Sequence, residues 1–209
     1  MSLPVRLLQA ITDFGDSEVL GLATLSATAV LFWSGERRAA TRFLLTMGCS
    51  MALIGACKIV FLGCGGAYGE RLHIYSPSGH TALTTAFCIA TAAHLSASRP
   101  HPLRFAIWLA AIGATFSVSA SRVLLGYHSK PEVVIGFLVG SVTAWVVGRA
   151  FPLSAAPKPS KPKQLAAFVA AIAVIAILFH GRHFPAERII RSIAGYLHEY
   201  IPACGAGTE

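Results

Sequence analysis

The chain has 209 residues, 55% of them hydrophobic and 12% charged, with a formal net charge of +8. Soluble globular domains carry about 25% charged residues, so this composition argues against a soluble domain and indicates a multi-pass membrane protein. The positive charges lie in short loops between apolar segments, which favours topology signals and contacts with anionic lipid over nucleic-acid binding.

The N-terminal segment, residues 1–16, contains a short amphipathic stretch at 3–14 whose leucine and isoleucine side chains share one face. We expect this stretch to lie along the membrane interface as a helix, with a frayed terminus as the alternative. We expect no cleavable signal peptide, because the first residues carry only one basic side chain, Arg6, and acidic residues lie at the start of the first apolar run.

Five apolar segments follow, and each is long enough for a helix that crosses a bilayer, which takes about 17–25 residues. They span residues 17–33, 42–63, 79–97, 103–125 and 132–150. Together they form a predicted membrane catalytic core at 17–151. The predicted fold is therefore all-α, a multi-pass membrane bundle of five core transmembrane helices.

The C-terminal part begins with a predicted cytoplasmic linker at 152–163, whose four prolines and three lysines argue against a helix. A run of 15 apolar residues at 165–179 is a candidate for a sixth transmembrane helix. An amphipathic stretch at 184–201 follows. We therefore assign residues 164–209 to an extra transmembrane helix and an amphipathic C-terminal helix.

The loop charges predict an orientation. Nine lysines and arginines fall in the loops at 34–42, 96–104 and 148–163, and seven fall on the opposite side. The positive-inside rule places the nine-charge side in the cytoplasm and both termini outside. The motifs described next lie on the opposite side, which would face the periplasm or exterior of a bacterial cytoplasmic (inner) membrane.

The first motif spans residues 76–80. Pro77 biases the residue before it away from helix, and Ser78 is a natural N-cap for the helix that follows. The backbone amides of Gly79, His80 and Thr81 are then expected to be free at a helix N-terminus, where they and the helix dipole favour an anion such as phosphate. His80 would stand beside that anion, able to donate a proton.

The second motif spans residues 121–132. Arg122 offers a planar fork that suits phosphate oxygens. Glu132 follows His128 by four residues, one helical turn, and a carboxylate on one imidazole nitrogen leaves the other free as a nucleophile. Lys58 lies within an apolar helix, where an ionisable residue suggests a function; snorkelling to the interface is the alternative.

The five cysteines have no metal-ligand spacing. Cys49, Cys57 and Cys88 fall inside apolar segments, where buried free thiols are common. Cys64 and Cys204 lie in predicted outer loops, so a disulfide bond between them is a candidate.

The motifs carry a resemblance to a known family. Pro77-Ser78-Gly79-His80, followed 41 residues after His80 by Ser121-Arg122 and then, past five residues, by His128, closely resembles the type-2 phosphatidic acid phosphatase superfamily. That superfamily includes lipid phosphate phosphatases and vanadium haloperoxidases, and its pattern is K-x6-R-P, P-S-G-H and S-R-x5-H-x3-D. Two of the three blocks are present.

The resemblance implies a set of roles. His128 would attack phosphorus and form a phosphohistidine, and His80 would protonate the leaving alkoxide and then activate water. Four groups would hold the phosphate oxygens: Lys58, Ser78, the amide of Gly79 and Arg122. No metal and no cofactor is implied, and the partners would be a phosphorylated membrane lipid and the bilayer itself.

Two departures from the family pattern matter. Gly65-Gly66 stands where Arg-Pro is expected, so a phosphate-binding arginine is missing. Arg71, six residues after Gly65, is a candidate replacement. Glu132 stands where the family has aspartate, and its longer side chain still reaches an imidazole but has more rotamer freedom.

Three functions remain open on the sequence. The first is a phosphatase that acts on a membrane lipid phosphate or diphosphate, such as phosphatidate, phosphatidylglycerol phosphate, undecaprenyl diphosphate or a lipid A phosphate. The second is a phosphotransferase of the same superfamily that passes the phosphate to a lipid or sugar hydroxyl. The third is a degenerate, non-catalytic member that binds a phospholipid. The haloperoxidase branch is disfavoured because those enzymes are soluble.

Overall fold

The computed structural model describes residues 3–64, 74–152 and 186–200, together with residues 170, 174, 175, 177 and 178 taken singly. Within these residues the chain is helical and has no strand. The described helices are α1 (Leu3–Asp13), α2 (Ser17–Trp33), α3 (Arg37–Cys64), α5 (Gly79–Ser96), α6 (His101–Leu124), α7 (Lys130–Ala150) and α9 (Ala186–Tyr200).

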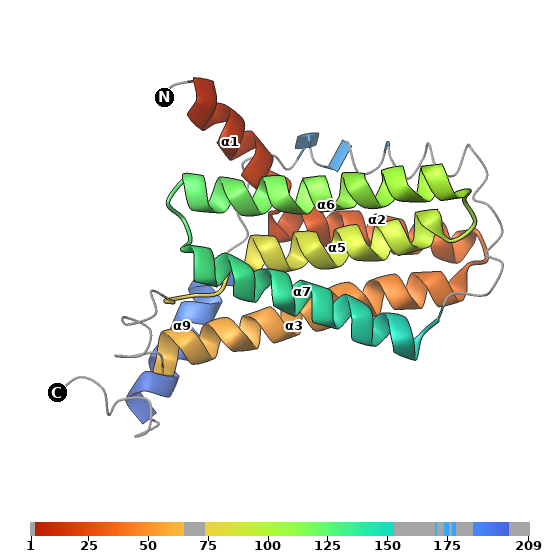
Figure 1. The fold of residues 1–209 in the computed structure, drawn as a ribbon. Coiled ribbons are helices and arrows are strands. Elements are labelled where there is room, and N and C mark those ends of the chain that lie inside the picture. Colours follow the sequence, from red (N-terminus) through yellow and green to blue (C-terminus); the bar gives the residue numbers. More distant parts are fainter. Residues whose placement is uncertain are drawn as a thin grey trace.

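Helix α5 is the centre of the bundle. It packs against α2, α3, α6 and α7, and these long helices run side by side in Figure 1. Because successive long helices alternate in direction, the end of α3, the start of α5, the end of α6 and the start of α7 all come to the same end of the bundle, where α1 and α9 also lie (Figure 1).

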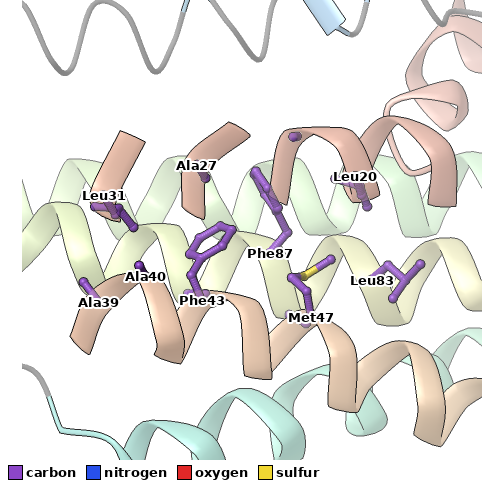
Figure 2. Close-up of a cluster of buried hydrophobic side chains, with 12 residues drawn as sticks. Leu20, Ala27, Leu31, Ala39, Ala40, Phe43, Met47, Leu83 and Phe87 are labelled. Atoms are coloured by element: carbon purple, nitrogen blue, oxygen red, sulfur yellow. The ribbon is translucent and has the colours of Figure 1, made fainter. Parts of the chain in front are cut away.

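The main hydrophobic core lies between α2, α3 and α5 (Figure 2). Its largest contact is between Phe43 of α3 and Phe87 of α5, whose ring centroids are 5.3 Å apart in an edge-to-face arrangement. Alanines such as Ala27 and Ala40 are buried around these rings and let the helix backbones approach closely. This core fixes the three helices whose ends carry the first motif and Lys58.

The helices agree with the predicted ones in number and place up to residue 150. The main difference is α3, which begins at Arg37 rather than at residue 42, because the basic residues expected in a loop form its first turn. Most of the candidate sixth helix at 165–179 and most of the linker at 152–163 lie outside the described residues, so the domain boundaries there stay predictions.

Among the described helices, α3, α6 and α7 are long and apolar enough to cross a membrane, and α2 is apolar but has 17 residues. Helix α5 is less apolar because it carries several threonines, and these are buried among its neighbours instead of facing lipid. The described residues thus form an all-helical fold whose three long apolar helices fit a membrane protein, and the number of membrane-crossing helices stays a prediction.

Candidate active site

The motif residues gather around one large cavity at the end of the bundle. The cavity has a volume of about 1740 Å³. The predicted site residues that line it are Lys58, Gly79, His80, Arg122, His128 and Glu132. Ser78 does not line it, and Arg71 lies outside the described residues.

The turn between α6 and α7 places the predicted nucleophile. Gly126 has a φ of +70°, a conformation that glycine adopts without strain. It ends α6 in a Schellman motif, in which the amide of Tyr127 donates to the carbonyl of Arg122 at 3.0 Å. The amide of His128 donates to the same carbonyl at 3.2 Å. These two hydrogen bonds fold the chain back on itself after α6 and fix the backbone of His128 close to that of Arg122.

His128 and Glu132 form the expected pair. Nδ1 of His128 and Oε2 of Glu132 are 2.9 Å apart, and Glu132 is 4% exposed. With its proton on Nδ1, His128 donates to the carboxylate and keeps a lone pair on Nε2. Burial lowers the pKa of the His128 imidazole from its ordinary value, while the hydrogen bond to Glu132 opposes that shift and Arg122 adds to it. The ring is therefore kept neutral at neutral pH.

The Glu132 carboxylate also accepts hydrogen bonds from three backbone amides. Its Oε1 accepts hydrogen bonds from the amides of Tyr75 and Ser76, both at 2.7 Å. Its Oε2 also accepts from the amide of Ser129 at 3.0 Å, which completes a capping box at the start of α7. One carboxylate thus joins the segment before α5 to the nucleophile, and the extra methylene of glutamate over aspartate extends the side chain across this gap.

The start of α5 follows the prediction in part. Ser78 is the N-cap, and its hydroxyl accepts from the amide and the hydroxyl of Thr81 at 3.4 and 3.0 Å. The expectation that the Thr81 amide is free is therefore wrong. Ser78 is fully buried, and its carbonyl lies so close to Gly136 that a Cβ there would collide with it. Its role as a phosphate ligand stays a prediction.

Lys58 contacts the first motif at Gly79. A methyl group at this position would lie 3.5 Å from Cε of Lys58, so the lysine passes directly over the start of α5. Lys58 is 8% exposed and its Nζ forms an ion pair of 2.8 Å with Oε2 of Glu187 on α9. The sequence contained no indication of this partner, because 129 residues separate the two along the chain.

His80 lines the cavity near the start of α2. Its Nε2 is 3.7 Å from Oδ2 of Asp16, the residue that caps α2 by accepting from the amide of Glu18. Gly15 packs so tightly here that a Cβ on it would lie 3.3 Å from Cβ of His80. Asp16 is thus a carboxylate beside the predicted acid and base that the motifs did not reveal.

Arg122 is held from two sides. Its Nη1 donates to the hydroxyl of Thr12 on α1 at 3.2 Å, and its guanidinium lies 4.6 Å from the ring centroid of Tyr127. Its buried Nε–H has no hydrogen-bond partner within the described part of the chain, and the same is true of the Ser76 hydroxyl. Both residues line the cavity, where a phosphate oxygen would satisfy such donors.

Two more arginines bring positive charge to the cavity, where the arginine of the family's K-x6-R-P block is missing. Arg6 of α1 and Arg191 of α9 both line the cavity. Neither belongs to a motif, and the only sequence signal for them was their place on amphipathic segments. Across residues 3–64, 74–152 and 186–200, histidine, cysteine and acidic side chains form no group of three or more that could hold a metal ion.

The structure describes one of the two cysteines of the predicted disulfide bond. Cys64 is disulfide-bonded, while Cys204 lies outside the described residues. Cys49, Cys57 and Cys88 are free thiols, as expected.

The comparisons with known proteins agree with the motifs. The PAP2 superfamily matches residues 61–156, a range that includes the motifs at 76–80 and 121–132. An uncharacterized 22.5 kDa protein in the cps region of Klebsiella pneumoniae is 35% identical over 138 residues, which span 64% of this chain and 64% of that protein. No solved structure matches the chain. The family match over residues 61–156 and the motifs within it support membership of the PAP2, or type-2 phosphatidic acid phosphatase, superfamily.

Proposed function

We propose that this protein is a lipid phosphate or lipid diphosphate phosphatase that works through a phosphohistidine at His128. Membership of the PAP2 superfamily supports phosphatase-type chemistry. The proposed location is the bacterial inner membrane with the site on the periplasmic face, which is supported by three membrane-length apolar helices and by the predicted excess of loop charge on the other side.

The observation that carries the proposal is the shape of the cavity. Its polar end is lined by the motif side chains, and the same cavity continues between α2 and α3 along apolar residues. The residues of this apolar arm include Gly21, Leu22, Leu25, Leu44, Gly48, Met51, Ile54 and Gly55. A substrate with a phosphate at one end and a hydrocarbon chain at the other matches both parts, whereas a small soluble phosphate would leave the apolar arm unfilled.

The proposed reaction begins with Nε2 of His128. Its lone pair forms a bond to phosphorus while the bond from phosphorus to the lipid oxygen breaks. His80 gives its proton to that oxygen, and the lipid leaves as a neutral alcohol. Glu132 stabilises the positive charge that develops on the His128 ring, because it faces Nδ1 at 2.9 Å.

The second half of the reaction uses water. His80, now neutral, accepts a proton from a water molecule as its oxygen attacks phosphorus. The bond from phosphorus to His128 breaks, and orthophosphate is released. Lys58 and Arg122 offset charge on the phosphate oxygens in both steps. A positioned acid or base such as His80 contributes about 10²–10⁴-fold to the rate.

The test is release of phosphate from a panel of lipid phosphates by the purified protein in detergent with a metal chelator. Wild type is expected to release phosphate and His128→Ala is not. A short incubation with radiolabelled substrate should trap an acid-labile adduct in wild type that is missing in His128→Ala. Absence of release from every lipid would refute the proposal and would favour a non-catalytic phospholipid-binding protein.

The same assay separates hydrolysis from transfer. With lipid and sugar alcohols added as acceptors, a phosphatase yields orthophosphate as its main product, and a phosphotransferase yields the phosphorylated acceptor. Both reactions share the first step at His128, so loss of activity in His128→Ala cannot distinguish them. The identity of the phosphorylated product distinguishes hydrolysis from transfer.

A further inference from the structure

Helix α9 brings a carboxylate into the group of cations that lines the cavity. Oε2 of Glu187 lies 2.8 Å from Nζ of Lys58. Glu187 lines the same cavity as Arg122 and His128. It therefore lies among the groups to which the motifs assign the substrate phosphate.

Glu187 is ionised in this position. Partial burial raises the pKa of its carboxyl, but the hydrogen bond and the charge of Lys58 outweigh burial and hold the pKa below its ordinary value. Arg191, one helical turn further along α9, adds a weaker contact at 3.7 Å. The carboxylate is 46% exposed, so it can exchange this lysine for water at a small cost.

The rest of α9 is fixed to α3 at a point beyond Glu187. Gly63 of α3 packs against Ala194, such that a Cβ on Gly63 would lie 3.0 Å from the Ala194 carbonyl oxygen. The His198 ring lies 3.3 Å from the Gly63 carbonyl oxygen. Glu187 stands at the opposite end of α9, in its first turn, where a small movement of the helix end separates it from Lys58.

We propose that Glu187 is a built-in competitor for the substrate phosphate, and that the first turn of α9 is a lid that must release Lys58 before a phosphate group binds there. This inference rests on the proposed function only in taking Lys58 as a phosphate ligand. A phosphate dianion carries more charge and more acceptor oxygens than a carboxylate, so it displaces Glu187 while weaker anions do not.

The test measures binding of inorganic phosphate to the purified full-length protein by calorimetry. Glu187→Gln is expected to bind phosphate more tightly than wild type by about two- to fivefold, in line with the loss of one partly exposed ion pair. Glu199→Gln, an exposed residue on the same helix, is the matched control and should bind like wild type. In a Lys58→Met background the gain from Glu187→Gln should disappear, because the two residues compete through that lysine.

The outcomes separate this inference from the proposed function. Equal or weaker phosphate binding by Glu187→Gln overturns the lid, even where wild type hydrolyses lipid phosphates. Tighter binding by Glu187→Gln in a protein that hydrolyses no lipid phosphate supports the lid and refutes the phosphatase. An equal gain in Glu199→Gln would show that helix charge alone is responsible and would also overturn the lid.

Discussion

Glu132→Gln tests the arrangement on which the site depends. The carboxylate accepts four hydrogen bonds, from Nδ1 of His128 and from the amides of Tyr75, Ser76 and Ser129. Glutamine keeps one acceptor oxygen, and its NH₂ group must then face two of these donors. Each hydrogen bond to a charged group contributes about 1.5–3 kcal/mol, so losing two costs about 3–6 kcal/mol.

Most of this loss should appear in the rate, because the imidazole loses both its orientation and the charge that stabilises the attacking ring. A loss of about 3–6 kcal/mol from the transition state corresponds to a decrease in kcat of roughly 10²–10⁴-fold. Glu132→Asp keeps the charge but is one methylene, about 1.5 Å, shorter. It should lose less activity, because it still holds either the imidazole or the segment at 75–76 but not both.

The assay is phosphate release from phosphatidate in detergent, with circular dichroism to confirm that each variant is helical. Glu199→Gln is a control for loss of one exposed carboxylate. The reasoning is refuted when Glu132→Gln retains more than about one tenth of the wild-type kcat, or when Glu132→Asp is as slow as Glu132→Gln.

Three further predictions follow from the same contacts. Because only the neutral His128 ring attacks, and burial lowers its pKa, kcat/KM should rise with pH through a midpoint below about 6.5; a midpoint above that value would contradict the assigned surroundings of the ring. Gly136→Ala places a Cβ against the Ser78 carbonyl and should destabilise the protein by about 1–3 kcal/mol, seen as a lower Tm, whereas Gly113→Ala, which meets nothing within 4 Å, should leave Tm equal or higher. Gly48→Phe fills the apolar arm and should raise KM for long-chain lipid phosphates while leaving a short-chain, water-soluble phosphate unaffected, and Gly113→Phe, outside the cavity, should change neither.

Much of the fold could be read from local patterns. Apolar runs predicted the five helices from α2 to α7, and α2 begins and ends at the predicted residues. Ser78 caps α5 as predicted from its neighbours in the chain. Such signals survive without tertiary information because lipid offers no hydrogen-bond partners, so each helix satisfies its own backbone over the span.

The pairing of His128 with Glu132 could also be predicted from local spacing, because a separation of four residues along a helical turn brings two side chains together. The convergence of the motifs needed one more step, that helices of alternating direction return their ends to one side. Both inferences used only spacing and topology, and Lys58, His80, Arg122 and His128 line one cavity in the structure.

The sequence by itself thus determined the helices, their caps and which end carries the chemistry. Only the tertiary structure decided what surrounds those side chains: Asp16 beside His80, the Glu132 carboxylate on the amides of Tyr75 and Ser76, and Glu187 on Lys58. These contacts join segments up to 129 residues apart. Their partners carry no motif, and whether they meet depends on how whole helices pack, which no short pattern encodes.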